Sequence, residues 1–161
     1  MNNRVNTPHD LVHLFPHNES EILARTQKII QRVTEAVNGI IALPDTQRSF
    51  VNTARALDTV FNDISIESAL FQTMMLVSPD ESIRNAAQNA YVQLSSCAVD
   101  MLTLNKELYK TLKTYAEHTS PHESLSSEEQ YYLTEILKDF KRNGLIIPSS
   151  VTVTPWGSSV R

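Results

Sequence analysis

Long segments with hydrophobic residues at helical spacing alternate, along this chain, with short polar segments that hold proline or a capping residue. The first long segment places hydrophobic residues in steps of three and four, which is the spacing of one face of an α-helix. These residues are Ile22, Ile29, Ile30, Val33, Val37 and Ile40 or Ile41. Asn18 with Glu21 three residues later is typical of an N-cap with a capping box. The pattern predicts a helix over residues 19–42.

Pro44 and Asp45 end this first helix, and a second helix is predicted to follow them. In the second helix one hydrophobic stripe holds Phe50, Ala54, Leu57, Val60, Phe61 and Ile64. The hydrophobic segment from Ser65 to Val77 follows directly. Its length predicts a short, buried connecting helix.

Ser78-Pro79-Asp80-Glu81 is typical of a helix start, with Ser as N-cap, Pro at the first helical position and acids where the helix dipole favours them. Hydrophobic residues then continue in steps of three and four, with one slip. They are Ile83, Ala87, Ala90, Leu94, Cys97, Met101, Leu104, Leu108, Leu112 and Tyr115. This seam predicts a single long helix near residues 79–117, packed at a shallow angle against an antiparallel neighbour.

The last helix begins with a second capping box, Ser126 to Glu129, and Asn143-Gly144 closes it. Its hydrophobic face carries Leu133, Ile136, Leu137 and Phe140. Together the segments predict an all-α fold, an antiparallel bundle of about five helices. We divide the chain into an N-terminal arm (1–17), a helical domain (18–148) and an irregular tail (149–161).

Composition and charge narrow the classes of function. The chain has 161 residues, 41% of them hydrophobic, and three glycines, which disfavours a turn-rich β architecture. A net charge of -4 gives no general attraction to nucleic acid or to an anionic membrane. No segment approaches the length of a membrane span, and Cys97 is the single cysteine. We therefore expect a cytoplasmic protein that binds neither nucleic acid nor membrane.

Two histidine patterns resemble metal sites. His122-Glu123 begins like the zincin motif, in which two histidines four residues apart hold zinc, but Ser126 stands at the second position and already serves as a cap. His9 and His13 are spaced to share a helix face, and His17 adds a third step of four, although Pro16 interrupts that helix. Zinc needs further ligands that the sequence does not indicate. We interpret the three histidines as part of a solvated arm, and we assign no metal ligand.

Other reactive side chains have packing roles in this interpretation. Cys97 falls on the hydrophobic seam, where a small buried thiol is common. Met74, Met75 and Met101 are expected to pack in the same way. Lys138, Lys141 and Arg142 gather at the C-terminal end of the last helix, where cations complement the helix dipole. No catalytic or cofactor-binding residue is assigned.

Several segments resemble the N-terminal helical region of the zinc oligopeptidases, the family of thimet oligopeptidase, neurolysin, oligopeptidase A and dipeptidyl carboxypeptidase. The similar segments occur in the family's order over about residues 45–148. They are Phe50-Val-Asn-Thr53 with Leu57-Asp58, Val77-Ser-Pro-Asp-Glu-Ser-Ile-Arg84, Tyr91 to Leu94 with Tyr109, and Leu137-Lys-Asp-Phe-Lys-Arg-Asn-Gly-Leu145 with Pro148.

The resemblance implies a large catalytic body downstream that holds zinc with two His and a Glu, and N-terminal helices that form one wall of a channel for short peptides. This chain has no His-Glu-x-x-His motif, so no zinc ligand or catalytic residue carries over. After Pro148 the sequence leaves the family's pattern, as expected of a truncated product or fragment.

Three hypotheses follow for the function. In the first, the chain is the structural N-terminal part of an oligopeptidase-like protein, inactive alone, and a hydrophobic face binds the catalytic part or a second copy. The alternative is a free-standing helical interaction module without enzymatic activity. The third is a small metal-dependent hydrolase that uses His9, His13 and His17.

Overall fold

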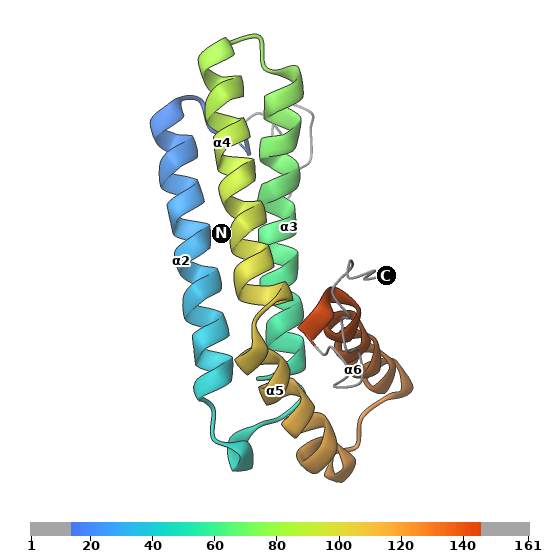
Figure 1. Ribbon diagram of the computed structural model, residues 1–161. Helices are drawn as coiled ribbons and strands as arrows, with labels where there is room; N and C mark the ends of the chain where they lie inside the picture. The colour runs from blue at the N-terminus through green and yellow to red at the C-terminus, as the bar shows by residue number, and fades with distance from the viewer. Residues whose placement is uncertain (1–13, 146–161) are drawn as a thin grey trace, which may run out of the picture.

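The regular structure is helical throughout residues 14–145, which are the residues that the computed structural model describes (Figure 1). Short 3₁₀ and π turns lie between the α-helices of this part of the chain, except between α3 and α4, which residues 78–80 connect. The α-helices are α2 (Glu19–Ala42), α3 (Ala54–Val77), α4 (Glu81–Ala98), α5 (Lys106–Thr114) and α6 (Ser127–Phe140). The predicted all-α bundle of about five helices is confirmed.

Three long helices, α2, α3 and α4, lie side by side in an up-down-up arrangement (Figure 1). The chain then bends into α5 at one end of this bundle, and α6 packs beside the start of α3. One hydrophobic core runs through all five helices. Its fully buried side chains include Val37, Leu57, Phe71, Leu94 and Leu112.

The first helix has the predicted bounds and the predicted start. The Asn18 side-chain oxygen accepts the Glu21 backbone N–H at 2.9 Å. The Glu21 carboxylate in turn accepts the His17 backbone N–H and the Asn18 side-chain amide, each at 2.8 Å. The box therefore closes one residue earlier than the standard form, on His17 instead of on the cap residue itself.

The second and third predicted helices form one helix, α3, so the prediction of a separate helix over residues 65–77 is wrong. No proline or glycine separates the two hydrophobic segments. Ile64, Phe71 and Met74 are all buried, so one hydrophobic face continues past Ser65. A single serine in a helix is too weak a breaker to end it.

The single long helix predicted near residues 79–117 is interrupted at Leu104 and Asn105. A π turn (Val99–Thr103) ends α4, with the Leu104 N–H donating to the Val99 carbonyl at 2.8 Å. Asn105 has an extended backbone, and its side chain caps α5 by accepting the Leu108 N–H at 3.0 Å. Leu104 is 47% exposed, so the slip in the hydrophobic seam marks this break.

The start of α4 lies two residues later than predicted. Asp80, not Ser78, is the N-cap, since its carboxylate accepts the Ser82 N–H at 2.8 Å. Arg84 donates to the carbonyls of Ser78 and Pro79 at 2.8 and 3.0 Å, which fixes the turn between α3 and α4. An ionised carboxylate is the stronger acceptor at a helix N-terminus, and this explains the shift.

The capping box predicted at Ser126 is confirmed. The Ser126 hydroxyl accepts the Glu129 N–H at 3.2 Å, and the Glu129 carboxylate accepts the Ser126 N–H at 3.0 Å. At the other end, α6 stops at Phe140 and a π turn (Lys141–Leu145) follows, so Gly144 lies inside a helical turn instead of closing the helix.

The predicted tail and most of the predicted arm lie outside the described residues. The three-part division of the chain therefore stays a prediction. Within residues 14–145 no helix combines the length and the hydrophobicity that crossing a bilayer requires.

Candidate functional site

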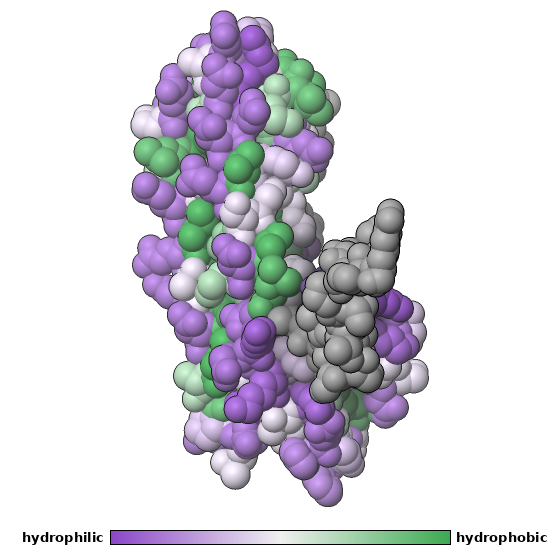
Figure 2. Space-filling view, in the orientation of Figure 1, coloured by the Kyte–Doolittle hydropathy of each residue, from purple (hydrophilic) through white to green (hydrophobic). Residues whose placement is uncertain are grey.

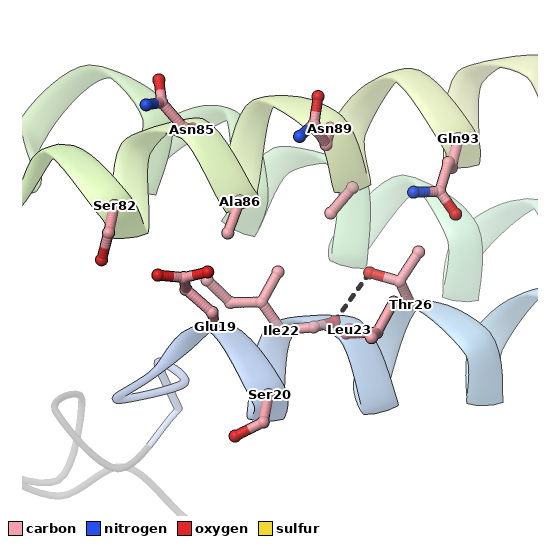
Figure 3. Close-up of a pocket in the computed structure, with 11 residues that line it drawn as sticks. Glu19, Ser20, Ile22, Leu23, Thr26, Ser82, Asn85, Ala86, Asn89 and Gln93 are labelled. Carbon is pink, nitrogen blue, oxygen red and sulfur yellow. Dashed lines mark hydrogen bonds between the residues drawn. The ribbon is translucent and has the colours of Figure 1, made fainter.

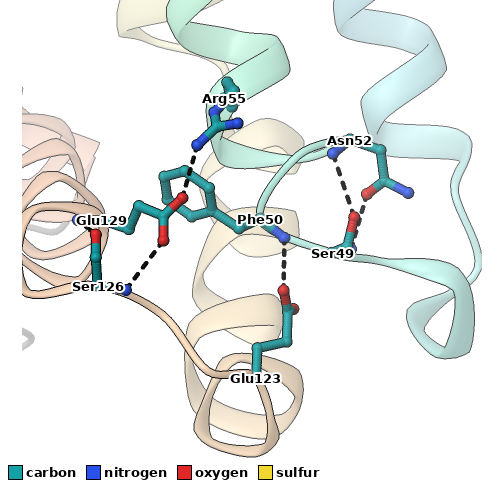
Figure 4. A network of polar contacts seen from close by, with 7 residues as sticks. All are labelled: Ser49, Phe50, Asn52, Arg55, Glu123, Ser126 and Glu129. Carbon is teal, nitrogen blue, oxygen red and sulfur yellow. Dashed lines mark hydrogen bonds and ion pairs between the residues drawn. The ribbon is translucent and has the colours of Figure 1, made fainter.

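Segments far apart in the sequence meet where α3 and α6 begin (Figure 4). The Phe50 backbone N–H donates to a Glu123 carboxylate oxygen at 3.1 Å. Arg55 pairs with Glu129 at 2.6 Å, and its guanidinium lies 5.3 Å from the centre of the Phe50 ring. Because Glu129 also closes the capping box of Ser126, this corner joins the starts of α3 and α6.

The Phe50-to-Thr53 segment builds the corner by its own local contacts. Asn52 accepts the Ser49 N–H at 2.8 Å, and Ser49 accepts the Asn52 N–H at 3.3 Å. Phe50 is buried with its ring edge-on to Tyr132 at 6.3 Å between centroids, and Thr53 is fully buried. Three of the four residues that carry the family resemblance here therefore fold the turn or fill the core.

Tyr115 and Glu123 bury polar atoms behind this corner. The Tyr115 hydroxyl and the second Glu123 oxygen, Oε1, are buried without a hydrogen-bond partner among the described residues. Burial, together with the nearby Glu123 carboxylate, raises the pKa of Tyr115 far above that of a free phenol. Glu123 also lines a small hollow with Ser120 and Gln130, and no metal-ligand set gathers there among the described residues. We assign these two buried groups a packing role.

A groove of about 490 Å³ runs between α2 and α4 (Figure 3). Asn85, Asn89 and Gln93 line it in a row along α4 and are exposed. Ala86 and Ala90, which have small side chains, line the groove between this row and α2. None of the three amide side chains makes a hydrogen bond to another described residue. The sequence interpretation missed this row, although three amides in steps of four with alanines beside them would have indicated it.

A second groove, of about 640 Å³, lies between α3, the π turn after α4, and α6. Its carboxylates are mostly paired: Arg142 lies 2.8 Å from Asp139, and Lys138 lies 2.6 Å from Glu135. Asp58 remains beside Tyr132, whose pKa is raised by burial and by this carboxylate. We assign no catalytic role to this groove.

The histidines singled out in the sequence are not brought together within the described residues. His9 and His13 lie outside residues 14–145, while His17 is exposed and precedes α2. His122 is exposed in a 3₁₀ turn, and its neighbour Glu123 points to Phe50 (Figure 4). Among residues 14–145 no three His, Cys, Asp or Glu side chains gather as metal ligands. Metal binding by the N-terminal histidines stays untested.

The methionines and the cysteine singled out in the sequence pack in the core or against it, as predicted. Met74 is buried, and Met75, Met101 and Cys97 pack against the core. Burial and the nearby Asp100 raise the pKa of the Cys97 thiol, which lowers its reactivity at neutral pH. At the end of α6, Lys138 and Arg142 pair with acids one turn earlier, as surface cations in a last turn commonly do.

Comparison with known proteins finds no matching family model. Two curated relatives are peptidases. The chain is 27% identical over 139 residues to the thimet-like oligopeptidase of Dictyostelium discoideum, which covers 83% of this chain and 20% of that protein. It is 26% identical over 126 residues to the mitochondrial intermediate peptidase of Malassezia globosa, covering 78% of this chain and 15% of that protein.

The molecule is thus an all-α helical protein without an assigned catalytic centre in its described part. Its relatives confirm the predicted resemblance: over most of its length the chain is similar to a thimet-like oligopeptidase and to a mitochondrial intermediate peptidase. It spans a fifth or less of the length of the curated relatives that it matches.

Proposed function

We propose that this chain is the N-terminal helical part of an oligopeptidase-like protein, where it packs on a zinc-dependent catalytic body and forms one wall of the channel that admits short peptides. The observation that carries this proposal is the structural role of the residues that show the family resemblance. Phe50, Asn52 and Arg84 fold turns between helices, and Phe140 packs on Tyr109 at 5.8 Å. Residues with these roles stabilise the arrangement of the helices, as expected of a structural part of a larger protein.

The zinc of such a protein is assigned to the catalytic body. The described residues hold no set of three metal-ligating side chains, so they do not fit a zinc centre, and we derive no chemical step from them. A cytoplasmic location stays a prediction, and one of the two relatives is mitochondrial by name.

Exposed hydrophobic residues supply a surface for the catalytic body. Val92 and Val99 lie seven residues apart on α4 and at its end, and they are 55% and 45% exposed. A seven-residue step returns to the same helix face. Figure 2 shows hydrophobic residues recurring among polar ones along the front of the bundle. In the isolated chain this face is expected to support weak self-association.

Sedimentation velocity over a range of protein concentrations tests this surface. We expect self-association of the full chain, which the double change Val92→Lys and Val99→Lys abolishes because a charge is costly to bury in a contact. A matched pair of lysines at Asn38 and Asn62, exposed on α2 and α3, is expected to leave it intact. A monomer at all concentrations would favour the alternative, a free-standing interaction module.

Zinc content and cleavage of a short quenched-fluorescent peptide, measured on the same sample with a chelator control, test the assignment of chemistry. We expect no cleavage by this chain alone, because its described residues carry no catalytic arrangement. Stoichiometric zinc with chelator-sensitive cleavage would contradict the proposal. The change of His9 and His13 to alanine would then show whether these histidines hold the metal.

A further inference from the structure

We propose that the groove between α2 and α4 binds an extended peptide segment from another molecule, with the Asn85, Asn89 and Gln93 amides hydrogen-bonded to the main chain of the peptide. The proposal goes beyond the function proposed above, since it requires no catalytic body and is testable on this chain alone.

The spacing of the amides fits an extended main chain. Residues four apart on an α-helix are about 6 Å apart along its axis. The same side of an extended peptide repeats every two residues, at about 6.6 Å. Over the two steps from Asn85 to Gln93 the mismatch grows to roughly 1.2 Å. The rotatable amide side chains can absorb a difference of this size.

The chemistry of the amides also fits. A primary amide offers both an N–H donor and a carbonyl acceptor, so each can pair with the N–H and the C=O that a peptide presents every second residue. Asn85, Asn89 and Gln93 make no hydrogen bond to other described residues and lie exposed along the groove (Figure 3). These groups are therefore available to a main chain without loss of an internal contact.

The floor of the groove accepts the side chains of such a peptide. Ala90 is buried at the bottom of the groove, and Ala86 beside it is partly exposed. Ile22 is buried beneath them, and Leu23 is 51% exposed on the α2 side. The floor is thus hydrophobic and the α4 side polar, which suits small hydrophobic side chains on one face of an extended peptide.

A charged residue at one end of the groove sets the orientation of the bound peptide. Glu19 is the single charged residue among those that line the groove, and it lies at the end near Ser82 (Figure 3). It forms no ion pair with a described residue. A cationic group of the peptide, either its free amino terminus or a Lys or Arg side chain, is complementary to this carboxylate. The expected ligand is an extended, neutral-to-basic peptide with its positive end at Glu19.

Fluorescence anisotropy of a labelled peptide is the direct test. The probe is the heptapeptide Lys-Thr-Ala-Thr-Ala-Thr-Ala with a fluorophore at its carboxyl end, titrated with the full chain. We expect saturable binding. The triple change Asn85→Ala, Asn89→Ala and Gln93→Ala is expected to weaken it by about tenfold or more, because at least two main-chain hydrogen bonds are lost. Absence of saturable binding to the unaltered chain would overturn the proposal.

A matched triple change separates the groove from the surface in general. Asn38→Ala, Asn62→Ala and Gln88→Ala remove three exposed amides that do not line the groove, and we expect unchanged affinity. Both triple variants are expected to fold, because exposed Asn or Gln to Ala changes in a helix do not lower helix propensity. Circular dichroism checks this. Equal weakening by both triples would overturn the assignment to the groove.

Modified probes test recognition of the main chain and the direction of binding. N-methylation of the three alanines of the probe removes alternate donors, and we expect binding to fall as far as in the groove triple. Glu19→Gln is expected to weaken the unmodified probe about threefold at low salt, and less at high salt. Undiminished binding of the methylated probe would contradict main-chain recognition.

Discussion

Single side chains in this protein join elements that are distant in sequence, and Glu123 is an example. One of its oxygens accepts the Phe50 N–H, while the other is buried near the Tyr115 hydroxyl without a partner. Burial of a carboxylate with only part of its hydrogen bonds satisfied costs free energy. The contact with Phe50 and the surrounding core must offset this cost.

Tyr115 leads to a prediction at alkaline pH. Its pKa is raised in the folded chain, while the unfolded phenol ionises near pH 10. Above that pH the unfolded state loses the proton first, so the free energy of unfolding falls as pH rises. Tyr115→Phe is expected to lessen the stability lost between pH 8 and pH 11 by about 1.4 kcal/mol, measured by urea unfolding.

Tyr131→Phe is the control for this prediction, since Tyr131 is 68% exposed and is expected to leave the pH dependence as it is. Tyr132 also has a raised pKa, so part of the alkaline loss remains in both variants. Identical pH dependence in the Tyr115→Phe variant and the unaltered chain would contradict the assignment.

Local contacts of residues were predictable from the sequence, and distant ones were not. The Ser126 capping box rests on residues three apart, so its spacing is visible in the chain. Arg55 reaches Glu129 across 74 residues, and no periodicity indicates such a pair. The amide row of α4 is local too, but its meaning depends on the groove that α2 forms beside it.

Helix boundaries show how weak local signals yield to packing. Ser65 does not end a helix, because the buried face of α3 continues through Phe71 and Met74. A helix does end at Leu104 and Asn105, although the hydrophobic spacing nearly continues across them. The Asn105 side chain caps α5 directly after the break. Leu102, in the π turn before the break, is buried and keeps the core filled.

The break between α4 and α5 is expected to depend on this cap. Asn105→Ala removes the acceptor for the Leu108 N–H and is expected to lower the free energy of unfolding by about 1 kcal/mol. Asn105→Asp keeps an oxygen in the same place and is the matched control. Urea unfolding followed by circular dichroism measures both, and an alanine variant as stable as the unaltered chain would show that the cap contributes nothing.

At the scale of the whole molecule, Arg25 ties three segments together. Its guanidinium pairs with both Glu67 oxygens at 2.7 and 2.9 Å and donates to the Leu14 carbonyl at 2.6 Å. It thereby links α2 to α3 and to the segment before α2. The Glu67 side chain is only 16% exposed, so water screens this pair less than a surface pair.

Arg25→Lys keeps the charge but loses the planar fork, and a single lysine nitrogen cannot reproduce the two parallel hydrogen bonds that separate arginine nitrogens make to Glu67. We expect the free energy of unfolding to fall by about 1–2 kcal/mol. Arg32→Lys is the comparison, because Arg32 also bridges α2 and α3, to Asp63, but is 59% exposed. Its effect is expected to be within about 0.5 kcal/mol by thermal unfolding. Equal effects would refute the importance of the fork.

The corner where α3 and α6 begin has a consequence for the order in which the chain assembles. Its Phe50–Glu123 hydrogen bond closes a loop of 73 residues, whereas α3 and α4 meet across one short turn. Loop-closure entropy makes the distant contact the later one to form. We expect α2, α3 and α4 to collapse first and α6 to dock last, so amide hydrogen exchange should find α6 opening before the three long helices.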